Sequence, residues 1–225
     1  MISITGIGWI SREEYGCVMK GMQEPYAGDA LPRKKIFSYG FKNFGRFDSV
    51  SKMTCSAVAL ALKDAGIDCS PELKHDIGII SANLSGCLET DTLYFKDYLE
   101  SGRTLARGNL FIYTLPSSPS GEAAIHFGLQ GPLLYITDQG RPVMTALRTA
   151  VEIILGGESY MMLAGLAEAD YAVYFVLKGG CDAGGDVLCS YDDAMKVLEK
   201  DLRFKELINE LLSLSVAKPI RQYQD

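Results

Sequence analysis

Residues 127–142 read FGLQGPLLYITDQGRP, and this stretch decides the fold that the sequence predicts. Residues 133–136 are a short apolar run of the kind that forms a buried strand. Pro142 stands at the first-turn position of a helix, and apolar residues at helical spacing continue to residue 154. The two glycines at 156–157 end that helix. A strand that leads directly into a helix is the repeating unit of an α/β fold.

The alternation of strands and helices extends outward from this stretch in both directions. Short apolar runs without helical period predict strands, and apolar residues that recur on one helical face predict helices. The predicted strands are residues 2–10, 77–83, 133–136, 160–165 and 172–177, and the predicted helices are residues 50–65, 90–99, 121–129, 142–154 and 190–214. Residues 11–47 are predicted to form a loop. The fold class is therefore α/β, with a mostly parallel five-stranded sheet and helices on both of its faces.

Glycine content divides the chain into three parts. Residues 1–178 are predicted to form the α/β domain. Residues 179–189 contain several glycines and are predicted to be a linker. Residues 190–225 are predicted to form an amphipathic helix and a frayed tail, with Ser190 and Asp193 at the spacing of a capping box. The apolar stripe of this helix is expected to cover part of an apolar face of the predicted helix that starts at Pro142.

The composition argues against several classes of function. The net charge is −6, whereas a nucleic-acid partner would need a basic face. No apolar window approaches the length of a membrane span, and the first residues read as a strand and not as a signal peptide, so we expect a cytoplasmic protein. Residues 33–35 (RKK) form the one short basic cluster, which we interpret as a solvated loop or as a contact for an acidic partner protein.

The cysteines and histidines do not form a metal-binding pattern. The chain has six cysteines without a C-x-x-C pair, and it has only two histidines. We therefore expect no metal site, no disulfide framework and no cofactor, and we expect the cysteines to be mostly buried thiols.

Several stretches, in the right order, resemble the N-terminal half of a β-ketoacyl synthase, a family of the thiolase-like superfamily. They are residues 4–10 (ITGIGWI), 47–52 (FDSVSK), 59–66 (ALALKDAG), 77–80 (IGII), 85–90 (SGCLET), 127–132 (FGLQGP) and the helix 146–158. The resemblance covers residues 1–178 and implies a layered, thiolase-like half-fold.

The resemblance puts a glycine where that family carries its catalytic cysteine. The family's nucleophile follows the Gly-Pro motif at the start of the next helix, where backbone N–H groups and the helix dipole stabilise a thiolate and form an oxyanion hole. In this chain Gly140 occupies that position and Gln139 lies beside it, while Arg141 and Pro142 replace two serines. Neither glycine nor glutamine is a nucleophile, so the resemblance implies no catalytic residue at this site.

The family also uses two active-site histidines, which lie in its C-terminal half. We expect this chain to end before that half begins. His75 and His126 match neither histidine, and we expect them to lie on the surface or to be satisfied within a helix.

Cys87 is the one alternative nucleophile that the sequence offers, because it lies in a turn after a strand. No histidine is placed to act as its base, so a small buried filler is the preferred interpretation. Asp138, Asp91 and Glu89 are candidates for a carboxylate cluster, and turn or cap roles explain each of them equally well.

These features lead to three functional hypotheses. The preferred one is a non-catalytic ketosynthase-like protein that acts as a partner subunit, similar to chain length factors, in fatty-acid-like or polyketide biosynthesis. Several such partners carry glutamine in the cysteine motif, and Gln139 stands one position early in this chain. The resemblance implies a homodimer or a heterodimer with an active ketosynthase, and an acyl carrier protein as a further partner. The second hypothesis is an enzyme that condenses or hydrolyses acyl thioesters through Cys87, and the third is a stand-alone binder of an acyl chain or another small molecule.

Overall fold

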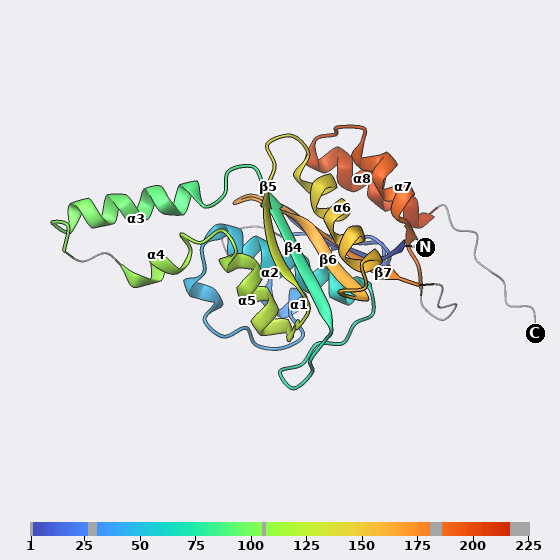
Figure 1. Ribbon diagram of the computed structural model, residues 1–225, viewed down its shortest axis with the longest axis horizontal. Coiled ribbons are helices and arrows are strands. Elements are labelled where there is room, and N and C mark those ends of the chain that lie inside the picture. The colour runs from blue at the N-terminus through green and yellow to red at the C-terminus, as the bar shows by residue number, and fades with distance from the viewer. Residues whose placement is uncertain (1, 27–30, 105–106, 181–185, 217–225) are drawn as a thin grey trace, which may run out of the picture.

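The computed structural model describes residues 2–26, 31–104, 107–180 and 186–216, which form one mixed sheet with helices on both faces (Figure 1). The strands are β1 (Ile2–Ile10), β2 (Glu14–Cys17), β3 (Met22–Pro25), β4 (Ile77–Asn83), β5 (Leu133–Thr137), β6 (Met161–Ala167), β7 (Ala172–Gly179) and β8 (Cys189–Ser190). The helices are α1 (Arg33–Ile36), the short 3-10 helix η1 (Phe44–Arg46), α2 (Ser49–Asp64), α3 (Leu88–Glu100), α4 (Gly108–Ile112), α5 (Ser118–Phe127), α6 (Pro142–Leu155), α7 (Tyr191–Leu198) and α8 (Phe204–Val216). The predicted α/β class with helices on both faces of a sheet is confirmed.

The strand order is β3-β2-β1-β7-β6-β4-β5, with β8 paired to β1. Strand β4 pairs in parallel with β5 and with β6, and the other pairs are antiparallel. The prediction of a mostly parallel five-stranded sheet is therefore wrong. Only residues 168–171 join β6 to β7, and such a short connection reverses the chain as a hairpin, whereas a parallel pair needs a crossover of about a dozen residues.

A second hairpin, β2–β3, lies within the segment that was predicted to be a loop, residues 11–47. Each of its strands has four residues, EYGC and MQEP, and neither shows a clear alternation of apolar and polar side chains. The hairpin extends the sheet because Gly8 on β1 pairs with Cys17 on β2. A strand this short and irregular gives no periodic signal in the sequence.

Helix α2 packs directly on β1 because β1 carries glycine where the two backbones meet. A Cβ atom at Gly8 would lie 2.1 Å from the backbone nitrogen of Ala61, and one at Gly6 would lie 2.5 Å from that of Ala65. With α5, helix α2 encloses the apolar core on this face of the sheet. The pattern ITGIGWI therefore sets the distance between helix and sheet.

Asp64, at the end of α2, ties this helix to β1 and to the turn after β2. Its carboxylate accepts the N–H groups of Ile7 at 2.8 Å, Met19 at 2.9 Å and Lys20 at 3.0 Å. The residue is 1% exposed, and burial raises the pKa of its carboxyl while the three N–H donors oppose that rise. The D-A-G motif at residues 64–66 is thus a structural joint of the fold.

The opposite face of the sheet is covered by α6, α7 and α8 (Figure 1). Residues 190–214 form two helices and not the single helix that was predicted, because Asp201 in the connection adopts a left-handed backbone conformation with φ of 51°. The side chain of Ser190 accepts the N–H of Asp193 at 3.1 Å, as the capping pattern predicts. Ile208 and Leu211 on α8 are buried in the same core as α6, as expected for a cover of that helix.

Part of the predicted linker, residues 179–189, lies outside the described residues. Gly179 belongs to β7, and Cys189 belongs to β8. In the part of the chain that the structure describes, no helix is both long enough and apolar enough to cross a membrane.

Candidate functional site at the start of helix α6

The three parallel strands bring their carboxyl ends to one edge of the sheet. In the register of β4 with its two neighbours, Asn83 lies opposite Thr137 of β5, and Ala82 lies opposite Leu166 of β6. The loop 138–141 then leads from β5 into α6. This edge therefore gathers the start of α6, the turn after β4 and the end of β6, which is the usual place for a site in a parallel sheet.

Asp138 organises the loop before α6. Its Oδ1 atom accepts the N–H of Gly140 at 2.7 Å and that of Arg141 at 3.3 Å, and its Oδ2 atom accepts the hydroxyl of Thr145. The Thr145 hydroxyl and the Gly140 N–H lower the pKa of the Asp138 carboxyl, so the group is an anion at neutral pH. The backbone N–H groups just before the helix thus already hold a carboxylate of the same chain.

Gly140 is exposed, and its conformation does not require glycine. A Cβ atom at this position would meet only Oδ1 of Asp138, at 3.3 Å, and the backbone does not adopt a left-handed conformation. Gln139 beside it is also exposed. A side chain at this position would therefore lie against the Asp138 carboxylate, which would have to shift by a few tenths of an ångström.

A cavity of about 190 Å³ opens beside Gly140. Its walls come from the start of α6, from the β6–β7 connection and from the α7–α8 connection, with Leu166, Tyr171 and Phe204 among its apolar residues. The rings of Tyr171 and Phe204 contact each other, with centroids 4.6 Å apart. The C-terminal helices thus close one side of the space at the start of α6.

Cys87 lies in the turn that leads from β4 to α3, in a separate and smaller recess. Its thiol donates to the carbonyl oxygen of Thr114 at 2.9 Å and lies 3.2 Å from Oδ2 of Asp91. Burial and the Asp91 carboxylate raise the pKa of the Cys87 thiol to about 11. A protonated thiol beside a carboxylate is a poor nucleophile.

The turn at Cys87 is held by polar residues that the sequence reasoning did not single out. The side chain of Asn83 accepts the N–H of Gly86 at 2.7 Å and donates to its carbonyl oxygen at 3.0 Å. Tyr135 of β5 donates to the Asn83 side chain, and Glu168 accepts the N–H of Leu84 at 2.8 Å. In the sequence, the one signal for Asn83 and Glu168 is their position: Asn83 ends one strand, and Glu168 follows a neighbouring strand.

The structure does not bring Asp138, Asp91 and Glu89 together as one cluster. Asp138 caps the loop before α6, Asp91 contacts the Cys87 thiol, and Glu89 lines the recess around Cys87. Across the described ranges, no group of three or more His, Cys, Asp or Glu residues could hold a metal ion.

Neither histidine lies at the start of α6. His126 is stacked between the rings of Phe41 and Tyr39, with centroid distances of 3.5 Å and 4.4 Å, and burial lowers its pKa to about 4. His75 pairs with Leu129 through a short backbone bridge. The Nε2 atoms of both rings are buried without a hydrogen-bond partner among the described residues, so the expectation that a helix satisfies them is wrong.

Helices α3 and α4 form an arm that extends away from the sheet (Figure 1). The rings of Tyr94 and Phe111 join the two helices, with centroids 5.7 Å apart. Seven large apolar side chains of the arm and of the turn that follows it are exposed: Leu88, Leu93, Phe95, Leu99, Phe111, Ile112 and Leu115. Such a concentration of exposed apolar side chains is typical of an interaction surface.

The family follows from comparison with known proteins. The model of the β-ketoacyl synthase N-terminal domain matches residues 19–177, and the chain therefore belongs to the β-ketoacyl synthase family. Among curated relatives, the chain is 28% identical over 139 residues to Nodulation protein E of Rhizobium leguminosarum bv. trifolii and 27% identical over 140 residues to that of Rhizobium meliloti. These matches cover 62% and 61% of the chain, but only 33% and 34% of the relatives, so the chain spans about a third of their length.

Solved structures share the thiolase-like ketosynthase fold. A β-ketoacyl synthase from Burkholderia phymatum STM815 aligns with a TM-score of 0.63 at 18% identity, over 83% of this chain and 62% of its own. The ishigamide ketosynthase/chain length factor aligns with a TM-score of 0.60 at 16% identity, over 92% and 73%. One chain of the complex between the ketosynthase ApeO and its chain length factor ApeC, from Xenorhabdus doucetiae, aligns with a TM-score of 0.56 at 13% identity, over 80% of this chain and 80% of its own.

Proposed function

We propose that this chain is a non-catalytic ketosynthase-like subunit that pairs with an active ketosynthase, in the manner of a chain length factor, in fatty-acid-like or polyketide biosynthesis. The observation that carries this proposal is the hydrogen bonding of Asp138 to the N–H groups of Gly140 and Arg141. In an active ketosynthase, groups at this position would stabilise a thiolate and an oxyanion. Here they hold an internal anion, and the residue assigned to the nucleophile position has no side chain.

The surface supports a role in binding. Strand β5 is the last strand of the sheet, and within the described residues it pairs with β4 only. Its far edge carries unpaired backbone groups, and Leu133 and Leu134 are 40% and 39% exposed. An exposed apolar edge strand is a template for pairing with another chain.

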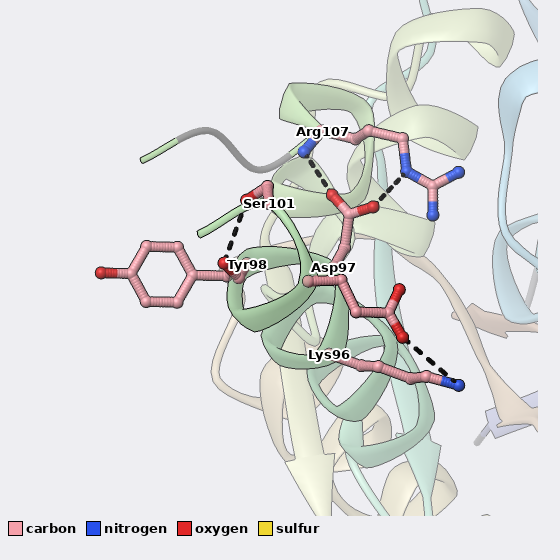
Figure 2. A network of polar contacts seen from close by, with 6 residues as sticks. Lys96, Asp97, Tyr98, Ser101 and Arg107 are labelled. Carbon is pink, nitrogen blue, oxygen red and sulfur yellow. Dashed lines mark hydrogen bonds and ion pairs between the residues drawn. The ribbon is translucent and has the colours of Figure 1, made fainter. Parts of the chain in front are cut away.

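The arm supports the same role because hydrogen bonds connect its two helices to each other and connect its base to the start of α2. The carboxylate of Asp97 accepts the backbone N–H and the Nε–H of Arg107, each at 2.9 Å, and this joins the end of α3 to the start of α4 (Figure 2). At the base of the arm, the hydroxyl of Thr90 lies 3.3 Å from the Asp48 carboxylate. A preorganised apolar arm loses less conformational entropy when a partner covers it.

The comparisons support this choice of partner. One aligned structure is a complex between a ketosynthase and its chain length factor. The alignment covers 80% of this chain and 80% of the matched chain of that complex, so this chain and the matched chain are similar in length. We propose a heterodimer first and a homodimer on the same surface when the chain is alone, with an acyl carrier protein as a further partner. We also propose a cytoplasmic location, and a division into a ketosynthase-like domain (1–178), a linker (179–189) and a C-terminal segment (190–225).

The test of the non-catalytic role is intact-protein mass spectrometry. The chain is incubated with an acyl-carrier thioester, alone and together with an active ketosynthase from the same organism. We expect the acyl adduct on the ketosynthase and none on this chain. An adduct on this chain that disappears in a Cys87→Ala variant would instead establish the enzyme that uses another nucleophile.

The cavity beside Gly140 favours one second candidate, a binder of an acyl chain. Its lining combines Leu166, Tyr171 and Phe204 with the polar start of α6. Native mass spectrometry of the purified chain with decanoate tests this function. A one-to-one adduct that is lost in a Leu166→Trp variant would support it, and the same adduct in both proteins would exclude the cavity as the site.

A further inference from the structure

A second and larger cavity, of about 300 Å³, lies at the carboxyl end of α2, and we name it the α2 cavity. We propose that the α2 cavity is a binding site for a small organic anion with an apolar body. Its volume falls at the lower end of the range of small-molecule sites, which combine an apolar lining with a few polar groups. The proposal is independent of the partner-subunit role.

The floor of the α2 cavity is apolar and is built by separate parts of the fold. Ile36 comes from α1, Ala59 from α2 and Phe127 from the end of α5, and Ile67 follows the turn at the end of α2. Ile36, Ala59 and Phe127 are buried, and Ile67 is partly buried. This floor would remove the apolar body of a ligand from water, which favours binding.

Two lysines stand at the rim. Lys20 follows β2 and Lys63 lies in the last turn of α2, and both are exposed. The lining of the cavity therefore includes two ammonium side chains, which come from two separate segments of the chain.

Both ammonium groups are available to a ligand. Among the described residues, no carboxylate lies within ion-pair distance of Lys20 or Lys63, and the Nζ atom of Lys63 contacts only the carbonyl oxygen of Lys35, at 3.4 Å. The buried Asp64 carboxylate is held by three backbone N–H groups. The charged residues that line the cavity are two lysines and one aspartate, Asp68, and this balance favours an anionic ligand over a cationic one.

The remaining polar groups of the lining suit binding and not covalent chemistry. Ser38 and Ser70 add hydroxyl groups, and the Ser70 hydroxyl lies 2.9 Å from the Glu72 carboxylate. Burial raises the pKa of the Cys69 thiol to about 11, so this thiol is neutral at physiological pH.

The α2 cavity is remote from the base of the arm. Helix α2 has 16 residues, which at 1.5 Å per residue separates its ends by about 24 Å. Asp48, where the base of the arm is attached, lies at the other end of the helix. Ligand binding in the cavity and pairing through the arm can therefore be tested separately.

The experiment uses anilinonaphthalene sulfonate, an apolar anion, with the full chain. Binding is followed by fluorescence, and the site is mapped from the backbone amide shifts of an isotope-labelled sample. We expect saturable binding with shifts at Ser38, Gly66 and Ile67. The neutral phenylnaphthylamine, which has the same rings without the sulfonate, should bind about tenfold more weakly, as expected for the loss of two exposed charge contacts.

Variants decide whether the α2 cavity is the site. The double variant Lys20→Gln/Lys63→Gln should raise the Kd of the sulfonate about tenfold, and Ser38→Trp should fill the cavity and abolish binding. The matched controls, Lys52→Gln on the same helix and Arg141→Gln at the other cavity, should leave the Kd unchanged. Shifts confined to the arm, or a Kd that the lysine variants do not alter, would overturn the proposal.

Discussion

The backbone N–H of Gly140 donates a 2.7 Å hydrogen bond to Oδ1 of Asp138, two residues before it. The same carboxylate oxygen accepts the N–H of Arg141. A residue with a side chain at position 140 would therefore lie against a negative charge and not in an empty anion-binding site.

A Gly140→Cys variant tests this electrostatic environment. The Cβ atom of the new side chain would lie against Oδ1 of Asp138, and its thiolate would be close to that carboxylate, so we expect the introduced thiol to react slowly with iodoacetamide. Adding Asp138→Asn should increase the rate about fivefold, the effect of one unit charge at ~4 Å in water. Peptide mapping by mass spectrometry distinguishes this thiol from the native cysteines. Equal rates in the single and double variants would show that Asp138 has no such effect.

Replacement of Asp64 should destabilise the fold. Asp64→Ala leaves the buried N–H of Ile7 and the partly buried N–H groups of Met19 and Lys20 without their acceptor, so the free energy of unfolding should fall by about 2 kcal/mol. Urea denaturation measures this loss. Asp68→Ala, four residues away and exposed, is the matched control and should change the unfolding free energy by less than about 0.5 kcal/mol.

His126 should make the fold less stable in mild acid. Burial lowers the pKa of His126 from 6.5 to about 4, so the unfolded chain binds more protons than the folded one between these values. Stability should be complete above pH 6.5 and should fall as the pH drops toward 4, by an amount of order 1 kcal/mol because solvent reaches part of the ring.

His126→Phe is the informative variant for this pH dependence. It preserves the stacking on Phe41 and removes the titrating group. The difference in unfolding free energy between pH 7 and pH 4.5 should therefore shrink relative to the wild-type chain. The same pH dependence in both proteins would assign it to other groups.

The C-terminal helices should contribute to the stability of the whole fold. Leu211 is fully buried in the core that α8 shares with α6, so Leu211→Ala should lower the free energy of unfolding by about 2–5 kcal/mol. Leu155→Ala is the matched control, because Leu155 is 72% exposed.

A chain that ends at residue 186 should be less soluble, because it exposes the apolar face that α7 and α8 cover. Unchanged solubility and thermal stability in that truncated chain would contradict this role.

The local elements were predictable, but the direction of the strands was not. The strand before Asp138 and the helix after Pro142 were correctly predicted because apolar spacing, a first-turn proline and terminal glycines are all local signals. Whether a strand runs parallel to its neighbour depends on the connection. The turn at residues 168–171 (EADY) carries no glycine or proline to indicate a hairpin.

The site was predictable only where its contacts are local. The cap of Asp138 on Gly140 spans two residues, and a turn or cap role was one of the two interpretations of Asp138. Asn83 and Glu168 could not be identified in this way, because both hold the same turn although Asn83 ends β4 and Glu168 follows β6. Phe204 lines the cavity beside Gly140 because α8 packs against that part of the fold. No local sequence pattern specifies this packing.

Pairing with an active ketosynthase is the central claim, and native mass spectrometry of the two purified proteins tests it most directly. We predict a one-to-one heterodimer that Leu134→Glu on β5 and Phe95→Glu on the arm each weaken at least about tenfold, as expected for a charge buried at an apolar contact. Leu155→Glu, at the exposed end of α6, should not alter the complex. A chain that stays monomeric in the presence of the ketosynthase, or a complex that neither surface variant weakens, would contradict the account.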